Sequence, residues 1–240
     1  MTTNTLSQAK VTVRRSEERG HADRGWLKSY HTFSFADYFD ADHMGFRSLR
    51  VINDDYVAAG GGFPTHPHRD MEILTYVISG QLAHQDSMGN GRTIQAGEVQ
   101  AMTAGRGVAH SEYNPSASEE VHLLQIWIIP NERGLTPQYS EWKPQPGRAS
   151  EGLTLLASQD GAGGVTIHQD AQLYLGELPE GGALTHHTSS ERGLWLQVIE
   201  GEVEAGEQTL GAGDAIAVEE ATALEVRASG KARFLLFDLA

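Results

Sequence analysis

The chain has 240 residues and a formal net charge of −14, with 39% hydrophobic residues, 21% charged residues and no cysteine. This composition is typical of a globular protein with one or two domains. The lack of cysteine excludes disulfides, thiolate metal sites and cysteine nucleophiles. The acidic balance, with no basic stripe, argues against direct binding of nucleic acid. Any metal must therefore be held by histidine and carboxylate side chains.

The N-terminal stretch, MTTNTLSQAKVTVRR, is polar and lacks the apolar core of a signal peptide. No apolar run in the chain approaches the ~20 residues needed to cross a bilayer. We therefore expect a cytoplasmic protein that has no membrane partner.

Short apolar runs, separated by glycines and other turn residues, follow one another along the first half of the chain. They are rich in Val, Ile, Leu and aromatic residues, as strands are, and no long stretch has the 3.6-residue apolar period of a helix. The sequence predicts strands within residues 49–55, 72–80, 91–105 and 121–130. The segment DSMGNGRT (86–93) places Gly-Asn-Gly between two strand candidates, which predicts a hairpin.

A boundary is predicted at residues 131–150, where NERGLTPQYSEWKPQPGRAS has three prolines and few β-branched residues. The strand pattern resumes in residues 165–178, 194–220, 223–228 and 232–240.

Two stretches, residues 73–98 and 194–214, share one order of apolar strand, glycine, alternating strand, turn and strand. This similarity indicates an internal duplication. We therefore expect an all-β chain with an N-terminal barrel at 1–135, a connector at 136–150 and a C-terminal barrel at 151–240.

The segment GGFPTHPHRDMEILTYVISG (61–80) begins as a loop and ends as a strand, with His66 and His68 two residues apart where the two meet. Alternate residues of a strand point to the same face, so both imidazoles can converge on one point. Convergent neutral imidazoles are good ligands for a transition metal. The alternative is that one ring caps the loop while the other is solvated.

A second pair with the same spacing, His110 and Glu112, lies in AGRGVAHSEYN (104–114). The two pairs would bring three imidazoles and one carboxylate to one barrel. Such a set suits a divalent transition metal and leaves one or two positions open for water or substrate, which implies chemistry. The alternative, four satisfied polar residues in a barrel mouth, must explain each pair separately.

Both pairs fall within patterns that resemble the cupin motifs. The first motif, G-x5-H-x-H-x3-E, stands here as Gly60, His66, His68 and Glu72, and the second as Gly97, His110 and Asn114. The sequence around these motifs resembles the pirin family of bicupins, and within it bacterial pirin-like proteins assigned as quercetin 2,3-dioxygenases. The segments that carry this resemblance are RGHADRGWLKSYHTFSFADYFD, THPHRDMEILTYVISG, HQDSMGNGRTIQAGEVQAMTAGRGVAHSEYN and LQIWIIP. It runs from about Val13 to the terminal LLFDLA and implies two cupin barrels of the double-stranded β-helix, jelly-roll type.

The resemblance also implies a set of metal ligands and a reaction. In the pirin family the ligands are the histidines of H-x-H and the His and Glu of H-x-E, which here are His66, His68, His110 and Glu112. We expect one divalent transition metal, with iron first and nickel, cobalt, manganese, copper or zinc as alternatives. The implied partners are O₂ and a small aromatic substrate, a flavonol such as quercetin, whose heterocycle opens with loss of CO. Glu112 is the candidate catalytic base.

Two other functions stay open at this point. Eukaryotic pirins are described as iron-dependent partners of transcription factors, so the chain could be a metal-binding regulator that acts through a protein partner. A cupin site also does not dictate its ligand, so a dioxygenase with a different substrate is a further alternative.

The sequence departs from the general cupin pattern at two positions. Thr103 replaces the usual proline of the second motif, and Glu72 occupies a position that is a metal ligand in many cupins. Because pirins use the later glutamate as a ligand, we predict that Glu72 does not bind the metal itself but orients a ligand imidazole.

The C-terminal copy lacks the equivalent ligand pattern. Adjacent His186 and His187 replace an H-x-H pair, and consecutive strand residues face opposite ways, so at most one of them could enter the barrel. No His-x-Glu follows them. The second barrel is therefore predicted to be free of metal.

Several further residues have a structural explanation and a functional one. His84 is expected to be a hydrogen-bonded structural residue, although it could face the pocket, and His122 and His168 are also expected to be structural. The aromatic residues of GWLKSYHTFSF are expected to pack in the core, with the covering of a flat substrate as the alternative: Trp26, Phe33 and Phe35. Arg106, between two glycines, is left open between a pocket cation and a solvated loop residue.

Overall fold

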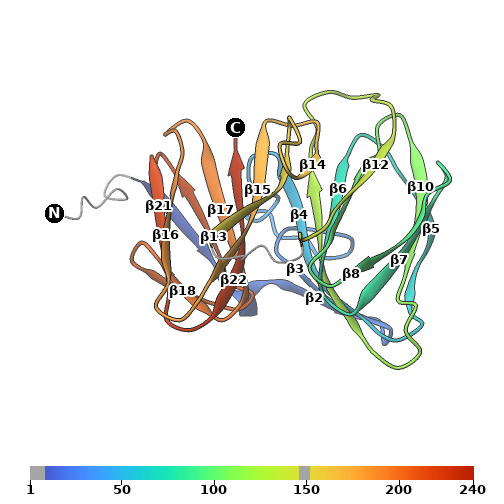
Figure 1. Cartoon of the computed structure of the whole chain (residues 1–240), viewed down its shortest axis with the longest axis horizontal. Helices are drawn as coiled ribbons and strands as arrows, with labels where there is room; N and C mark the ends of the chain where they lie inside the picture. The colour runs from blue at the N-terminus through green and yellow to red at the C-terminus, as the bar shows by residue number, and fades with distance from the viewer. Residues whose placement is uncertain (1–8, 146–151) are drawn as a thin grey trace. The chain divides into compact units, whose positions relative to one another are not determined.

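The computed structural model describes residues 9–145 and 152–240, and within these ranges nearly all regular structure is β-strand (Figure 1). The one helical element described is η1, a short 3₁₀ helix at Ser16–Glu18. The predicted all-β class is therefore confirmed. Within the described ranges no helix is long and apolar enough to cross a membrane. Residues 1–8 and 146–151, which include part of the predicted connector, lie outside the described residues.

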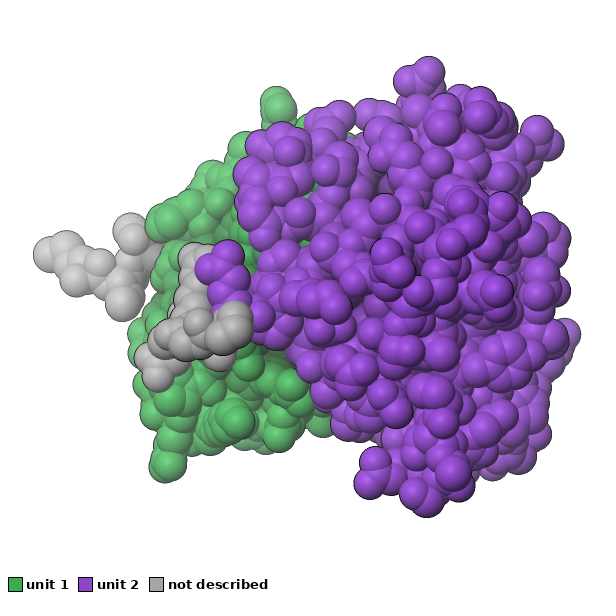
Figure 2. All heavy atoms as spheres, turned by 45° about the vertical axis from the view of Figure 1, so that its right-hand side comes forward, with its two compact units in different colours: residues 1–18, 147–158, 170–240 green, residues 19–146, 159–169 purple. Residues whose placement is uncertain are grey.

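The chain divides into two units (Figure 2). Of the described residues, the N-terminal barrel (purple) contains 19–145 and 159–169, and the C-terminal barrel (green) contains 9–18, 152–158 and 170–240.

Two antiparallel sheets form the N-terminal barrel, with strand orders β12-β9-β6-β11-β4-β3-β2 and β5-β10-β7-β8. The strands of the larger sheet are β2 (Gly20–Asp23), β3 (Leu27–His31), β4 (Leu49–Val57), β6 (Glu72–Ser79), β9 (Val99–Thr103), β11 (Val121–Ile128) and β12 (Gln138–Trp142). Those of the smaller sheet are β5 (Gly62–His68), β7 (Gln81–Asp86), β8 (Gly91–Gln95) and β10 (Val108–Tyr113). The short β14 (Val165–Thr166) lies beside β9 and β12.

The C-terminal barrel repeats this plan, with orders β1-β20-β17-β22-β15-β13 and β16-β21-β18-β19. The strands of its larger sheet are β1 (Lys10–Arg14), β13 (Gly152–Ser158), β15 (Ala171–Leu178), β17 (Gly193–Glu200), β20 (Ala215–Glu219) and β22 (Ala232–Leu239). Those of the smaller sheet are β16 (Ala183–His187), β18 (Glu202–Ala205), β19 (Gln208–Gly211) and β21 (Ala223–Ala228). The predicted duplication is confirmed by the strand orders. The runs β9-β6-β11 and β10-β7-β8 of the N-terminal barrel correspond to β20-β17-β22 and β21-β18-β19 of the C-terminal barrel.

Two segments lie differently from the boundaries drawn on the sequence. β1 pairs with β20 along its whole length, from Lys10 opposite Glu219 to Arg14 opposite Ala215, so it completes a sheet of the C-terminal barrel. β12 lies inside the predicted connector and pairs with β9. The QYSEW segment between the prolines has a free backbone N–H at every residue, so it can serve as an edge strand. In each barrel the edge of the larger sheet is thus completed by a segment outside the repeated strands.

The hairpin predicted at residues 86–93 is confirmed, because β7 and β8 pair antiparallel from Gln81 opposite Gln95 to Gln85 opposite Gly91. The core of the N-terminal barrel lies between its two sheets. Leu82 and Ile94 of the smaller sheet pack there against Val77 and Leu123 of the larger one. The polar residues considered next lie on the same inner faces.

Candidate metal centre

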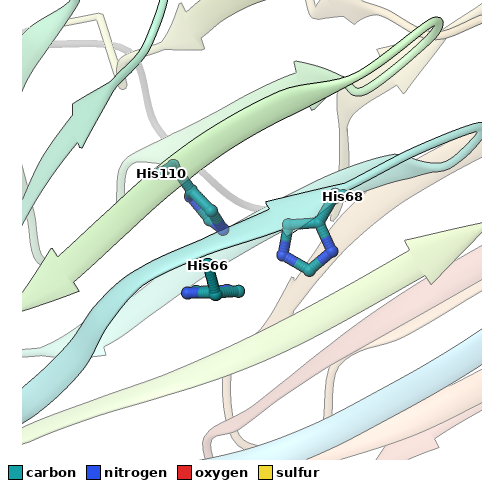
Figure 3. A group of neighbouring side chains, drawn as sticks. All are labelled: His66, His68 and His110. Atoms are coloured by element: carbon teal, nitrogen blue, oxygen red, sulfur yellow. The ribbon is translucent and has the colours of Figure 1, made fainter.

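Three of the predicted ligands come together on strands β5 and β10 (Figure 3). The register sets His66 opposite His110, and His68 lies two residues further along β5 on the same face. The ring centroids of the pairs His66–His110, His66–His68 and His68–His110 are 4.5, 4.7 and 4.9 Å apart. One ring nitrogen from each of the three lies within 4.8 Å of the others.

The protonation of these rings leaves lone pairs free for a metal ion. Nδ1 of His66 lies 2.8 Å from the carbonyl oxygen of Pro64, which can only accept, so Nδ1 carries a proton and the lone pair of the neutral ring is on Nε2. Nε2 of His110 is buried and has no hydrogen-bond partner within the described residues. Burial and the neighbouring imidazoles lower the pKa of His68 to about 4 and that of His110 to about 3, so both are neutral at pH 7. This donor set fits a transition metal.

Glu112 is held on the other side of His110. Its carboxylate groups with His84 and His110 within 4.8 Å, and not with the group formed by His66 and His68. Oε1 accepts hydrogen bonds from Nε2 of Gln100 at 2.7 Å and from the Thr75 hydroxyl at 3.4 Å, and Oε2 accepts one from Nε2 of Gln125 at 3.1 Å. Burial raises the pKa of Glu112 to about 7, although these hydrogen bonds act to lower it. The side chain can therefore exchange a proton near neutral pH.

The three partners of Glu112 form one row across the larger sheet. Thr75 on β6 pairs with Gln100 on β9 at one side and with Gln125 on β11 at the other. Cross-strand partners point to the same face, so the register alone aims all three polar side chains at Glu112 of the opposite sheet.

The structure does not bring Glu72 to the imidazoles. Strand residues alternate between faces, and Thr75 faces the barrel interior, so Glu72, three residues earlier on β6, faces the opposite way. Its Oε2 accepts a hydrogen bond from the Thr103 hydroxyl at 2.8 Å, and burial raises its pKa to about 7. Thr103, which replaces the motif-two proline, is thus the partner of Glu72, and no hydrogen bond joins Glu72 to a ligand imidazole among the described residues.

A further residue that the sequence argument missed, Asp86, lies behind His110. Nδ1 of His84 is 3.5 Å from Nδ1 of His110, and Nε2 of His84 is 3.2 Å from Oδ2 of Asp86. Burial lowers the pKa of His84. Burial raises the pKa of Asp86, but the hydrogen bonds it accepts, chiefly from Asn90, outweigh this and hold its pKa below the usual range. The signal in the sequence is the H-x-D spacing on a strand, which matches the H-x-E of its neighbour β10.

His66 and His68 line a cavity of about 460 Å³ in the N-terminal barrel. Its wall carries His66, His68 and Glu112, with four aromatic residues and a polar block on β3 and β4. The aromatic residues are Trp26, Phe35, Phe63 and Trp127, and the polar block is Ser29, His31, Asn53 and Asp55. Phe35 and Trp127 meet edge to face at 5.4 Å, as do Trp26 and Phe63 at 5.1 Å. Ligand pockets typically measure about 300–1,000 Å³ and are lined mainly by apolar and aromatic side chains, so this cavity suits a flat aromatic molecule.

Asp55 stands out in the polar block. It is buried and hydrogen-bonded to Ser29, while its Oδ1 has no hydrogen-bond partner among the described residues. Burial raises the pKa of Asp55 to about 7.

The remaining candidates fall into pocket and structural positions. Trp26 and Phe35 line the pocket, whereas Phe33 is a core residue. His122 has a structural place: its Nε2 lies 2.6 Å from Oδ1 of Asp54, and its ring stacks on Tyr56 at 3.9 Å.

Two candidates have no contact with the imidazoles or the pocket. Nε2 of His168 is buried without a partner among the described residues. Arg106 is exposed and is not part of the pocket wall.

Comparison with known proteins agrees with this geometry. The family model described as Pirin matches residues 12–128, and the one described as Quercetinase C-terminal cupin domain matches residues 155–239. A protein of Escherichia coli K12 named quercetin 2,3-dioxygenase is 47% identical over 230 residues, which are 95% of this chain and 98% of the relative. A pirin-like protein of Caulobacter vibrioides is 40% identical, with 93% and 97% of the two chains covered.

A solved structure with the same fold contains a metal. The crystal structure of the bacterial pirin YhhW from Escherichia coli in complex with nickel(II) superposes with a TM-score of 0.92, at 47% identity and with 96% of this chain and 99% of that chain covered. That complex, with the donor set found here, suggests a single bound metal. The two repeated barrels, the histidines gathered in the first of them and relatives matched over nearly their whole length lead to one conclusion: the chain belongs to the pirin family.

Proposed function

We propose that this protein is a metal-dependent dioxygenase that cleaves a flavonol such as quercetin with O₂. The observation that carries the proposal is the cavity of about 460 Å³ whose wall combines three of the proposed metal ligands, His66, His68 and Glu112, with aromatic side chains. A metal at this place would be open to a bound flat molecule, which a buried structural metal would not be. The name of the 47% identical relative, quercetin 2,3-dioxygenase, supports the same substrate class.

The proposed ligands are His66, His68, His110 and Glu112, and the proposed metal is iron. When bound, the metal would supply Lewis acidity that makes a coordinated hydroxyl of the substrate easier to ionise. Glu112 lies in the pocket wall with its pKa raised by burial to about 7, so its carboxylate can take the proton of that hydroxyl. Gln100 and Gln125 donate to its two oxygens and hold the carboxylate in place.

The rest of the wall would bind and orient the substrate. The aromatic pairs Phe35–Trp127 and Trp26–Phe63 offer flat apolar contact and exclude water. The polar block offers hydrogen bonds to ring hydroxyls, and the unpartnered Oδ1 of Asp55 is an acceptor for one of them.

The test is quercetin-dependent O₂ uptake by the purified protein of known metal content, with release of CO measured in parallel and His66→Ala as the control. We expect uptake and CO release that the control abolishes. Absence of both from protein loaded in turn with iron, nickel, cobalt, manganese, copper and zinc would contradict the proposal and favour a metal-binding regulator. Metal analysis of protein purified without added metal tests the assignment of iron. The cytoplasmic location stays a prediction.

A further inference from the structure

A chain of three buried side chains runs from β10 into β7, on the side of the imidazoles that does not face the pocket. The register places Asp86 opposite His110 and His84 opposite Glu112. His110, His84 and Asp86 have exposed fractions of 2%, 3% and 9%. Neither His84 nor Asp86 belongs to the pocket wall, so these two residues have no place in substrate binding.

The hydrogen bonds along this chain fix the proton of each ring in turn. A carboxylate only accepts, so the contact of 3.2 Å between Oδ2 of Asp86 and Nε2 of His84 puts the proton of His84 on Nε2. Neutral His84 then has its lone pair on Nδ1, which lies 3.5 Å from Nδ1 of His110, a long contact at the limit for a hydrogen bond. His110 must donate in this contact, so its own lone pair is on Nε2. That atom is the one that is buried without a partner among the described residues.

The far end of the chain is anchored by the β7–β8 turn. Oδ1 of Asp86 accepts from the backbone N–H groups of Met88 at 2.9 Å and Asn90 at 3.0 Å, and Oδ2 accepts from Nδ2 of Asn90 at 2.8 Å. The ring of Tyr139 stacks on His84 with centroids 4.8 Å apart and planes inclined by 25°. Both Asp86 and His84 are thus held in one orientation before any metal binds.

We propose that His84 and Asp86 are positioning residues that act through His110: they hold its ring with Nε2 toward the metal and make that nitrogen a stronger ligand. Outer partners of ligand histidines act in this way in metalloproteins, and their loss typically weakens metal binding about 10- to 100-fold. Here the carboxylate would act through an intervening imidazole. The inference rests on the proposed function, since it requires a metal at the three imidazoles.

The test compares His84→Leu with His84→Gln in the full chain. Leucine removes both hydrogen bonds, whereas the amide of glutamine can accept from His110 and donate to Asp86. The matched control is His122→Leu, which removes a histidine from the His122–Asp54 pair on the same barrel, where no proposed ligand lies behind it. The readouts are the affinity for Co²⁺, measured by competition with a chromophoric chelator, and the ligand-field spectrum of bound Co²⁺.

We expect His84→Leu to weaken Co²⁺ binding about 10- to 100-fold and to change the spectrum. His84→Gln should restore most of the affinity, and His122→Leu should bind as the wild type does. Wild-type affinity and spectrum in His84→Leu would overturn the proposal. So would equal losses in the leucine and glutamine variants, because then the imidazole would matter for its shape and not for its hydrogen bonds.

Two further arms separate the ways in which the test could fail. Should His84→Leu not fold, Asp86→Asn, which keeps the shape and removes the charge, must still weaken Co²⁺ binding, and wild-type affinity in that variant would overturn the role of Asp86. Quercetin turnover enters none of these readouts. A wild type that binds Co²⁺ but consumes no O₂ with quercetin would contradict the dioxygenase and leave the His84–Asp86 test valid, whereas a wild type that binds no Co²⁺ would overturn both.

Discussion

The two barrels share one strand plan but fill their interiors in opposite ways. In the N-terminal barrel, Thr75 on β6 pairs with Gln100 and Gln125 on the strands beside it. In the C-terminal barrel the equivalent β17 residue, Leu196, pairs with Ile216 and Leu236. All three aliphatic residues are fully buried in one core cluster. The same backbone thus carries a polar row around Glu112 in one copy and a continuous apolar core in the other.

The strand pairs that carry the histidines differ in the same sense. His66 faces His110 across β5 and β10, whereas His186 faces Leu224 across β16 and β21. Nε2 of His186 lies 2.8 Å from Oδ2 of Asp238, which also forms an ion pair with Arg192. The lone buried imidazole therefore has a protein partner, while Nε2 of His110 has none among the described residues.

The position equivalent to Asp55 of the pocket wall is filled by an aromatic ring in the second copy. Asp55 lies opposite Leu123 on β4 and β11, and Gly176 lies opposite Phe234 in the matching pair β15 and β22. A Cβ atom built on Gly176 would lie 2.2 Å from the ring of Phe234, so this ring occupies the space above the glycine. The comparison teaches that one strand plan accommodates either continuous apolar packing or a polar row and unpaired polar atoms at equivalent positions.

His110→Leu, which copies Leu224 of the C-terminal barrel, should have the largest effect. We expect the variant to lose its metal and its turnover with quercetin, because only the two imidazoles of β5 remain of the three that converge. The stability of the metal-free protein should change by less than about 1 kcal/mol, because the unpaired Nε2 of His110 is removed but Nδ1 of His84 loses its partner. Metal content, O₂ uptake and denaturant unfolding check this. Full metal occupancy in His110→Leu would remove His110 from the ligand set.

Glu112→Gln removes the charge of the Glu112 side chain and keeps its shape. The amide has nearly the volume of the carboxylate but cannot take up a proton, so we expect metal to stay bound while kcat falls about 10²- to 10⁴-fold, the usual contribution of a general base. Steady-state O₂ uptake beside metal analysis measures both. Unchanged kcat would exclude Glu112 as the base.

Strand periodicity, the hairpin and the duplication could be predicted from the sequence, because alternation and turn residues are local properties. That His66 and His68 share a face could be predicted as well, since residues two apart on a strand do so, whereas the place of His110 opposite His66 depends on the register of β10 with β5. The position of Glu72 could not be predicted by the same rule. Glu72 lies four residues after His68, but the chain turns between β5 and β6, so spacing along the sequence does not carry the face of one strand over to the next.

Contacts that depend on the register between strands could not be predicted from the sequence. That Gln100 and Gln125 converge on Glu112 follows from pairing between β6, β9 and β11, which lie far apart in the chain. The partnership of Asp86 with His84 depends on the anchored turn after β7. β12 was missed because its flanking prolines are as typical of a connector as of an edge strand.

Asp238→Ala tests the other side of the comparison, where the buried imidazole is satisfied by protein. Removal of the carboxylate leaves His186 and Arg192 without their shared partner, so we expect the free energy of unfolding at pH 7 to fall by about 3 kcal/mol, with metal content unchanged. Burial raises the pKa of Asp238, but its hydrogen bonds, first that to His186, hold it below the usual range. The stabilisation is therefore present above the unfolded pKa of about 4 and is lost as pH falls through the lower folded value.

The control for Asp238→Ala is Asp170→Ala, which removes the exposed second partner of Arg192. It should change stability by less than about 1 kcal/mol. Equal losses in the two variants would mean that the surface contact to Arg192, and not the buried pair, stabilises this barrel.

Asp55→Asn should have no effect near pH 4 and a growing one as pH rises, and it measures what the polar interior of the N-terminal barrel costs in stability. Burial raises the pKa of Asp55 to about 7 in the folded chain, above the unfolded value of about 4. The folded state therefore binds a proton that the unfolded state has lost between these pH values, and the free energy of unfolding falls as pH rises through this window. Asparagine does not titrate, so the metal-free variant should match the wild type near pH 4 and exceed it by about 4 kcal/mol at pH 8, since the folded pKa lies about three pH units above the unfolded one, at about 1.4 kcal/mol each. Urea unfolding of both proteins across this range gives the difference directly. A difference that is constant with pH would mean that the carboxyl of Asp55 ionises as freely in the folded chain as in the unfolded one, and the unpaired Oδ1 would then carry no penalty.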